Sequence, residues 1–144
     1  FFDTFQKDVA DIMTSPVLVT HDSYIQDAII TLFMYDADVL YVIDEDKLLL
    51  GIMSRKDLLR ASLNSNIDST PVAVCMTRMP HIITCNKEMN ILEAAALLQD
   101  HSIDSLPVVE ETNDRKIVGS VTKSALLDYI IQHARSAEMK REEG

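Results

Sequence analysis

Two kinds of apolar pattern alternate along the chain: helical stripes and short continuous runs. In the first half, five residues recur at helical spacing and predict one apolar helix face: Ile25, Ala28, Ile29, Leu32 and Phe33. A strand is expected over residues 39–43, a polar turn over 44–47 and a returning strand over 48–53. A second helix is expected over residues 55–61.

The second half repeats this order of elements. Its helical stripe consists of Ile91, Leu92, Ala94, Ala95 and Leu98. A hairpin is expected from strands over 106–109 and 116–121, followed by a helix over 123–133. In both halves a Met-Thr pair, a proline and a short apolar strand ending in threonine (17–20 and 81–84) precede the first helix.

Polar residues indicate where these elements begin and end. Ser23 with Gln26 is a candidate capping box for the first helix, and Asn86 is the candidate cap of its counterpart. Residues 64–70 form a polar linker between the halves. The charged tail over 136–144 is expected to fray.

The predicted fold class is α+β, with two repeats of the order strand, helix, strand, strand, helix. We assign residues 8–63 to the first repeat, 64–70 to the linker, 71–135 to the second repeat and 136–144 to the tail. A three-stranded sheet with two helices cannot bury both of its faces alone. We therefore expect the halves to pack sheet to sheet about a pseudo-two-fold axis.

Composition and charge narrow the possible functions. The chain has 144 residues, of which 47% are apolar, and a net charge of −10, which argues against nucleic-acid binding by this part. No apolar run approaches the roughly 20 residues that span a bilayer. Two cysteines are too few for a disulfide framework. Because the chain opens with Phe1 and has no basic leader, we interpret it as an excised part of a longer cytoplasmic protein without a membrane partner.

Residues capable of catalysis or metal binding form no recognised pattern. The spacing of Cys75, His81 and Cys85 matches no zinc site, and both cysteines lie among apolar residues. No nucleophile occupies an elbow motif, and no histidine has a motif-fixed acid partner. We therefore expect no metal site, no catalytic cofactor and no enzyme activity.

Repeated short motifs carry a family resemblance. The sequence Ile-Met-Thr stands at residues 12–14, Cys-Met-Thr at 75–77, Ser-Leu-Pro-Val-Val at 105–109 and Gly-Ile-Met-Ser-Arg-Lys-Asp-Leu-Leu at 51–59. In this order they resemble the CBS (cystathionine β-synthase-type) repeat, two of which form a Bateman module. The resemblance covers residues 9–133 and implies a non-catalytic module that binds an adenine nucleotide and reports it to a partner.

The junction between the predicted strand and helix at residues 51–57 indicates how a nucleotide is held. A helix that starts at Ser54 presents unpaired N–H groups and partial positive charge, which suit a phosphate. The Ser54 hydroxyl can donate to that phosphate, and Arg55 and Lys56 add positive charge. Asp57, one turn on, can accept hydrogen bonds from both ribose hydroxyls. The resemblance implies the same phosphate and ribose roles for Ser54 and Asp57.

Two further residues of this junction belong to the candidate site. Gly51 leaves room for close backbone approach, and the resemblance implies that Ile52 lines the sugar and base. The spacing of Ser54 and Asp57 is also that of an ordinary helix cap with an acid in the first turn, which needs no ligand. The repeated family motifs favour the ligand site over the plain cap.

The resemblance also places the adenine of this ligand against the opposite repeat. The matching positions are His81, Ile82, Ile83 and Ile103. Backbone groups at these positions can read the edge of the base while the aliphatic side chains enclose the ring. His81 also fits an ordinary strand-end residue, and Ile83 an ordinary core residue.

A weaker second site is expected at Val17, Ala37, Gly119, Thr122 and Lys123. It keeps a glycine and a hydroxyl, but Ala125 replaces the ribose-binding acid, at a cost of about a few kcal/mol. Some nucleotide-sensing CBS proteins carry basic residues where this chain has Asp38 and Asp104. The choice among AMP, ADP and ATP therefore stays open.

A narrower resemblance suggests the protein that contains this module. Residues 54–62 and 76–80 resemble the CBS half of the catabolite-control repressors of gluconeogenesis, in which a winged helix-turn-helix precedes the pair. This implies the effector domain of a transcriptional repressor, dimeric through its helices, with DNA bound by a missing N-terminal domain. Three alternatives stay open: regulation of an enzyme or transporter by direct contact, binding of S-adenosylmethionine, and a ligand-free dimerisation unit.

Overall fold

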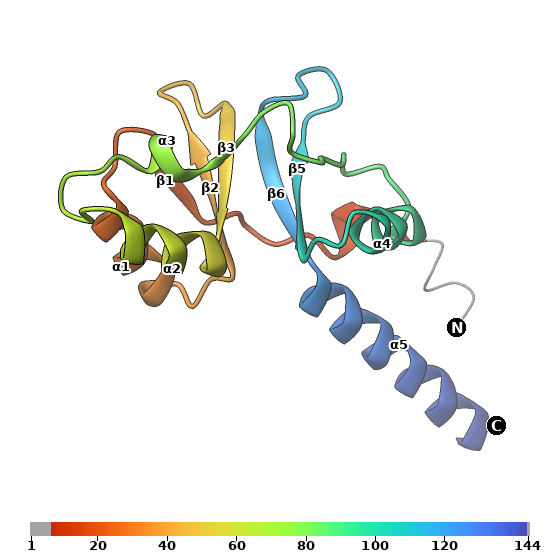
Figure 1. Ribbon diagram of the computed structural model, residues 1–144. Helices are drawn as coiled ribbons and strands as arrows, with labels where there is room; N and C mark the ends of the chain where they lie inside the picture. Colours follow the sequence, from red (N-terminus) through yellow and green to blue (C-terminus); the bar gives the residue numbers. More distant parts are fainter. Residues whose placement is uncertain (1–6, 144) are drawn as a thin grey trace. The chain divides into compact units, whose positions relative to one another are not determined.

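The computed structural model describes residues 7–143, which form two compact units (Figure 1). Unit 1 contains the described residues up to Ser15, residues 84–111 and residues 118–143. Unit 2 contains residues 16–83 and 112–117. The α+β class predicted from the sequence is confirmed, because both units combine helices with a sheet.

Unit 2 is built on a four-stranded sheet in the order β1 (Leu18–Thr20), β2 (Val39–Ile43), β3 (Leu49–Ser54), β4 (Thr77–Arg78). Strand β1 runs parallel to β2, and the other two pairings are antiparallel. The helices of this unit are α1 (Ile25–Met34), α2 (Arg55–Asn64) and α3 (Val72–Cys75).

The core of unit 2 joins these helices to the sheet. All five residues of β2 are buried, whereas burial alternates along β3, with Leu49, Gly51 and Met53 on its buried face. This is the period-2 pattern of a strand that has one covered face. Met53 forms one hydrophobic cluster with Leu58 from α2 and Ala28 from α1, so the start of α2 is packed against the end of β3.

Unit 1 contains the hairpin β5 (Ser105–Val109) and β6 (Ile117–Thr122), whose first residue belongs to unit 2. Its helices are α4 (Ile91–Asp100) and α5 (Lys123–Glu143), preceded by a one-turn 3-10 helix at Val9–Asp11. The hairpins and helices expected in both halves are thereby confirmed.

The predicted strand over residues 81–84 is wrong. Only Cys85 pairs with the hairpin, as an isolated parallel bridge to Val108. In unit 2, the amide of Tyr41 donates to Val17 O at 3.0 Å and extends the β1–β2 ladder. Pro107 stands at the matching position of β5 and has no N–H, so the equivalent bond cannot form.

Each unit contains the Met-Thr segment of the other repeat. In unit 2, Thr77 pairs with Ile52 as part of β4. In unit 1, Thr14 and Ser120 exchange two backbone hydrogen bonds of 2.9 Å. A glycine lies beneath the methionine in both cases, Gly51 under Met76 and Gly119 under Met13.

The helix caps predicted from the sequence are each displaced. Helix α1 starts after Tyr24, whose amide donates to Asp27 Oδ2 at 3.0 Å, and the Ser23 hydroxyl instead pairs with Thr20 Oγ1. Helix α4 starts after Asn90, whose Oδ1 accepts from the amide of Leu92 at 2.7 Å. The side chain of Asn86 accepts from the amide of Glu88 and forms a turn before the helix.

Helices α1 and α4 end in the same left-handed turn. Asp36 and Ser102 have φ values of 47° and 52°, and the following amides, those of Ala37 and Ile103, bond to carbonyls five residues back. This is the Schellman arrangement, which favours glycine at the left-handed position. A non-glycine residue there carries a steric cost.

Replacing Ser102 by glycine is therefore expected to raise the free energy of unfolding by about 0.5–1 kcal/mol. Chemical denaturation followed by circular dichroism measures this change. The matched control is Ala96→Gly, at an exposed position in the middle of α4, which should lower stability by about 1 kcal/mol. Equal effects of both substitutions would contradict a steric cost at Ser102.

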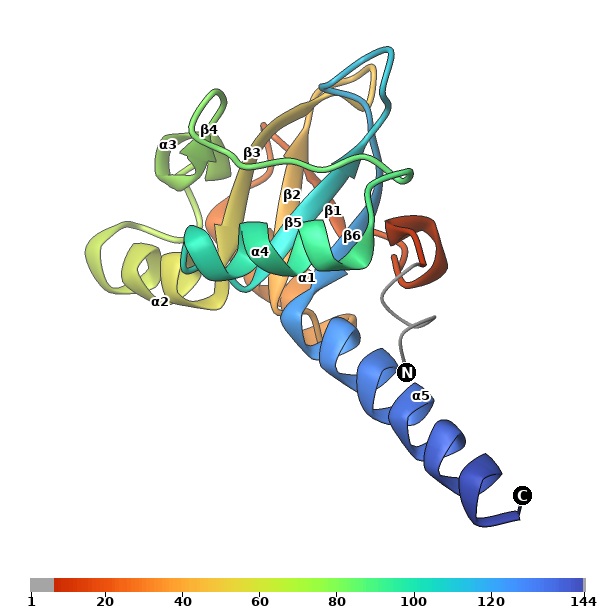
Figure 2. The ribbon, with the colours of Figure 1, turned by 90° about the vertical axis from the view of Figure 1, so that its right-hand side faces the viewer.

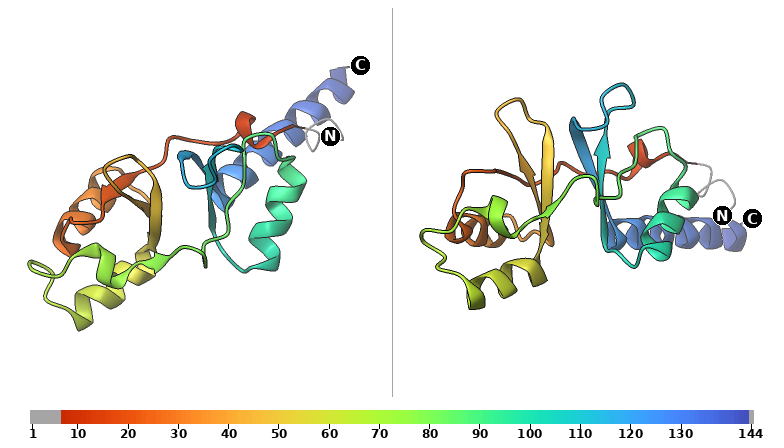
Figure 3. Two further views of the ribbon diagram at one scale, coloured as in Figure 1. Left: turned by 90° about the horizontal axis from the view of Figure 1, so that it is seen from above. Right: turned by 45° about the horizontal axis from the view of Figure 1, so that its top comes forward.

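Helix α5 is longer than the sequence predicts. It continues through the charged segment that was expected to fray and reaches Glu143, while Gly144 lies outside the described residues. Figures 2 and 3 show its C-terminal half projecting beyond α4 and the hairpin of unit 1. None of the described helices is long and apolar enough to cross a bilayer.

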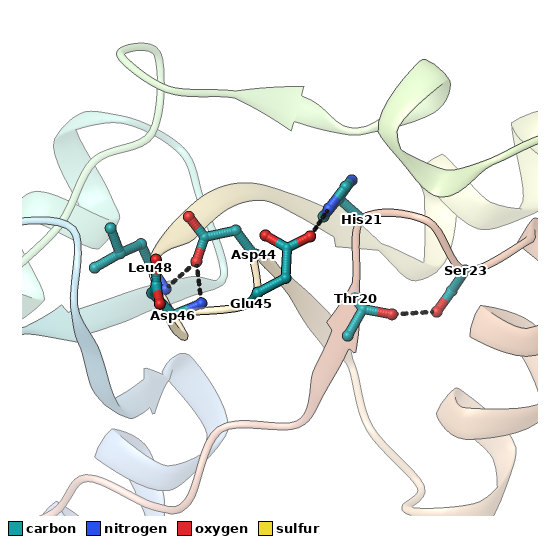
Figure 4. A network of polar contacts seen from close by, with 7 residues as sticks. All are labelled: Thr20, His21, Ser23, Asp44, Glu45, Asp46 and Leu48. Atoms are coloured by element: carbon teal, nitrogen blue, oxygen red, sulfur yellow. Dashed lines mark hydrogen bonds and ion pairs between the residues drawn. The ribbon is translucent and has the colours of Figure 1, made fainter.

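An exposed polar network joins the end of β1 to the β2–β3 turn (Figure 4). His21 Nε2 and Glu45 Oε1 lie 3.0 Å apart. Asp44 Oδ1 accepts hydrogen bonds from the amides of Asp46 and Leu48, both at 2.9 Å, and fixes the turn. The hydrogen bond with Glu45 raises the pKa of His21 above its usual 6.5.

The pair predicts a pH dependence. Because the pKa of His21 is raised on folding, its stabilising contribution is present below the pKa of the unfolded chain and is lost as the pH rises through the folded value. We expect the imidazole of His21 to titrate above 6.5 by NMR, and Glu45→Gln to lower that pKa. An unchanged pKa in Glu45→Gln would rule out the pair as its cause.

Candidate functional site

The β3–α2 junction of unit 2 brings Ser54 and Asp57 together. Ser54 ends β3 and is the N-cap of α2, with its Oγ accepting from the amide of Asp57 at 3.2 Å. The amide of Ser54 donates in return to Asp57 Oδ2 at 2.9 Å. Two of the otherwise unpaired amides at this helix start are thus satisfied reciprocally.

The second carboxylate oxygen of Asp57 lies near an exposed cation. The side chain is 25% exposed, and Oδ1 lies 3.9 Å from Arg60 Nη1, one turn further along α2. An exposed ion pair at that distance contributes little, about 0–1 kcal/mol. Asp57 can therefore keep its capping bond through Oδ2 and offer Oδ1 to a hydroxyl group.

Arg55 and Lys56, the two cations predicted at the site, have different surroundings. Arg55 Nε donates to Ala37 O at 3.0 Å and lies 3.2 Å from Asp38 Oδ1, and its Nη2 lies 3.3 Å from Asp36 Oδ1. The expected free charge of Arg55 is thus already paired with two carboxylates. Lys56 is exposed on the first turn of α2.

The space beside Gly51 is filled by the protein itself. A Cβ atom built on Gly51 would lie 2.7 Å from Met76 Cγ and 2.8 Å from the carbonyl oxygen of Thr77. The close approach that this glycine permits is therefore that of β4. The role of Gly51 in ligand binding stays a prediction.

The remaining predicted residues of unit 2 lie on and after the sheet edge. Ile52 is half-buried on the face of β3 opposite the buried residues. The segment that follows β4 stays beside β3, since the amide of Met79 donates to Leu50 O at 3.3 Å. In this segment His81 is exposed and Ile82 is buried at 9% exposure.

Ile83 is half-buried and is the last residue of the 16–83 segment of unit 2, whereas Ile103 belongs to unit 1. There, the amide of Ile103 closes the Schellman turn of α4 by donating to Leu98 O at 3.0 Å. The shared role of these residues in holding an adenine ring stays a prediction.

The candidate second site is divided between the units. Thr122 Oγ1 accepts from the amide of Ala125 at 3.1 Å and caps α5, but Ala125 has no carboxylate to return the bond. Gly119 packs beneath Met13, and Lys123 is exposed with its amide donating to Asp104 O at 2.8 Å.

The other two residues proposed for the second site lie in unit 2. The carbonyl of Val17 accepts from Tyr41, and Ala37 is buried in the turn after α1. Their joint role with Thr122 stays a prediction.

Comparison with known proteins gives the same two-repeat organisation. The CBS domain family matches residues 9–64 and again residues 70–132. The transcriptional repressor CcpN of Bacillus subtilis is 38% identical over 125 residues, which are 85% of this chain and 59% of that protein. The chain therefore spans about three fifths of the length of this relative.

Two solved structures of CBS proteins with bound ligands are similar to the chain. CBSX2 in complex with AMP has a TM-score of 0.77 and 26% identity, covering 89% of this chain and 98% of that one. The CBS domain pair of protein MJ0100, in complex with 5'-methylthioadenosine and S-adenosyl-L-methionine, has a TM-score of 0.74 and 25% identity, covering 86% and 99%. The chain therefore belongs to the CBS domain family, as a tandem pair of CBS domains.

Proposed function

We propose that this chain is the nucleotide-sensing part of a cytoplasmic transcriptional repressor, and that it has no enzyme activity of its own. The observation that carries the proposal is the Ser54–Asp57 arrangement at the start of α2, where one carboxylate oxygen caps the helix and the other lies 3.9 Å from the exposed Arg60. Relatives that bind AMP or S-adenosylmethionine support the ligand class. Similarity to a repressor supports the setting.

In this proposal an adenine nucleotide binds along the β3–α2 junction. Asp57 Oδ1 accepts from a ribose hydroxyl, and the Ser54 hydroxyl together with Lys56 receives the first phosphate. Ile52 packs against the sugar, and the base lies against residues 81–83 and Ile103. The Thr122 end of the second repeat binds more weakly, because its helix has Ala125 where α2 has Asp57.

Regulation then follows from a population shift. A ligand held by both repeats favours the arrangement of the repeats that binds it best, by the difference in its affinity for the available arrangements. In the repressor this bias reaches DNA through a domain outside the chain. The same bias acting on an enzyme or transporter is the alternative, since a CBS pair carries no information about what it regulates.

The experiment that tests the ligand class is calorimetric titration of AMP, ADP, ATP and S-adenosylmethionine into the chain. Saturable binding of a nucleotide, competed by the other adenine nucleotides, supports the proposal. Binding of S-adenosylmethionine alone would replace the nucleotide by the second ligand class. Absence of heat and of any thermal shift with all four compounds would leave a ligand-free dimerisation unit.

We also propose that the chain forms a homodimer through α1 and α2. These helices pack on each other and leave large apolar side chains exposed, with Phe33 at 78%, Leu63 at 77% and Met34 at 76%. Large apolar side chains exposed on two packed helices are typical of an interaction surface. Light scattering should give a dimer, and a monomer for Phe33→Glu with Leu63→Glu. The control Val74→Glu, on α3, should stay dimeric; a wild-type monomer would contradict the proposal.

A further inference from the structure

The start of α2 is largely occupied by the protein's own acceptors. The amide of Arg55 donates to the backbone oxygen of Asp38 at 3.3 Å, and the amide of Asp57 donates to Ser54 Oγ. The amide of Ser54 is taken by Asp57 Oδ2. Helix starts attract phosphate because such amides are unpaired, so the attraction is weakened here.

Carboxylates also surround this helix start. Asp38 reaches Arg55 through both its backbone oxygen and its Oδ1, and Asp36 reaches the same guanidinium. The junction and the loop after α1 contain three cations (Arg55, Lys56, Arg60) and three carboxylates (Asp36, Asp38, Asp57), and two of the cations are paired with these carboxylates. The site therefore has no surplus positive charge for a polyphosphate.

We infer that Asp36 and Asp38 make the proposed site selective for adenosine ligands with few phosphates, so that AMP binds more tightly than ADP, and ADP more tightly than ATP. This inference rests on the proposed function. The ribose and the base bind as described under the proposed function. Each added phosphate brings further negative charge toward the carboxylates of Asp36 and Asp38. Arg55 is a positioning residue in this scheme, because it holds the loop of Asp36 and Asp38 against α2.

Repulsion between exposed groups sets the size of the effect. Two charges about 8 Å apart in water interact by only a few tenths of a kcal/mol once salt screens them. With two additional charges on ATP and two carboxylates in the protein, we expect the preference for AMP over ATP to be roughly fivefold to tenfold near physiological salt. The preference should be larger at low salt.

The test is titration of AMP and ATP, without divalent cations and at two salt concentrations, into the wild type and three variants. Neutralising both carboxylates, Asp36→Asn with Asp38→Asn, should tighten ATP binding more than AMP binding and narrow the ratio of the two affinities about fivefold. Arg55→Gln should act in the opposite direction, since it removes the cation but keeps both carboxylates. Asp104→Asn is the matched control, because Asp104 O accepts from the Lys123 amide at the corresponding place in the second repeat.

The outcomes separate this inference from the proposed function. The inference is supported if the wild type binds AMP more tightly than ATP and if, among the variants, only Asp36→Asn with Asp38→Asn narrows the ratio of the two affinities. Tighter ATP than AMP binding by the wild type, or a ratio unaffected by the double variant, overturns it while leaving a nucleotide site in place. If the wild type binds none of the nucleotides, the proposed function itself is overturned. Thermal melting of each variant verifies that the fold is retained.

Discussion

Asp57→Ala is expected to weaken the binding of the tightest adenine nucleotide about a hundredfold, as measured by calorimetric titration. Hydrogen bonds to a charged group each contribute about 1.5–3 kcal/mol, and a methyl group cannot accept from the ribose hydroxyls. The substitution also removes the bond from the Ser54 amide to Asp57 Oδ2. A loss of about 1 kcal/mol of stability is therefore expected beside the loss of binding.

A matched control separates the two effects. Asp27 occupies the same third helical position in α1, where its Oδ2 accepts from the Tyr24 amide at 3.0 Å. Asp27→Ala should cost similar stability and leave nucleotide affinity unchanged. Equal nucleotide affinity in wild type and Asp57→Ala would move the site elsewhere, whereas equal losses of affinity in both variants would attribute the effect to stability alone.

Gly51→Ala is expected to destabilise the protein by about 2–3 kcal/mol. The added methyl group would meet Met76 and, at 2.8 Å, the carbonyl oxygen of Thr77. A methionine side chain can rotate away, but the backbone of β4 is held by its pairing with β3. For a chain of this length the melting temperature should fall by roughly 5–10 °C, measured by circular dichroism.

Gly119→Ala provides the comparison in the other unit. The three atoms nearest to the added methyl group there all belong to the Met13 side chain, with Sδ at 2.8 Å and Cγ at 3.3 Å. Because a flexible side chain can adjust, a loss of about 1 kcal/mol or less is expected. Equal losses of stability in Gly51→Ala and Gly119→Ala would show that the backbone of β4 can move and that the carbonyl of Thr77 does not obstruct the added methyl group.

Local patterns predicted most of the elements but not where the helices begin. The apolar face of α1 could be predicted because its residues, such as Ile25 and Ala28, are buried against the rest of the unit. Any fold that contains this helix must bury that face. The start of α1 depends on distant partners, because the amide of Ile25 donates to Thr70 O and the amide of Val72 donates to Ser23 O. These bonds pair Tyr24 with Pro71 and keep Tyr24 in extended backbone, so the helix begins one residue later than its sequence suggests.

The start of α4 has the same cause. Asn90 bridges Asp8, and the amide of Ile91 donates to Lys7 O at 3.0 Å. Residues more than 80 positions apart set this boundary, and no window of sequence contains both. The predicted cap at Asn86 was wrong because the pairing of Asn90 with Asp8, which is distant in the sequence, fixes the start of the helix at Asn90.

The candidate site divides in a similar way. Ser54 and Asp57 are three residues apart on one helix turn, so their spacing alone predicts the reciprocal cap. The partners of Arg55 could not be predicted, because Asp36 and Asp38 reach it only through the left-handed turn that ends α1. The Met76–Gly51 contact left a signal, since both halves carry a methionine and a glycine at matching positions.

The exchange of Met-Thr segments has a consequence for any attempt to divide the chain. Thr77 completes the sheet that contains Ile52, and Thr14 pairs with Ser120, so each sheet borrows backbone from beyond the linker. A single repeat expressed alone would expose the edge of β3 or β6 and would be prone to aggregate. A protease cut within residues 64–70 would instead leave two fragments threaded into each other's sheets, which should copurify and unfold as one.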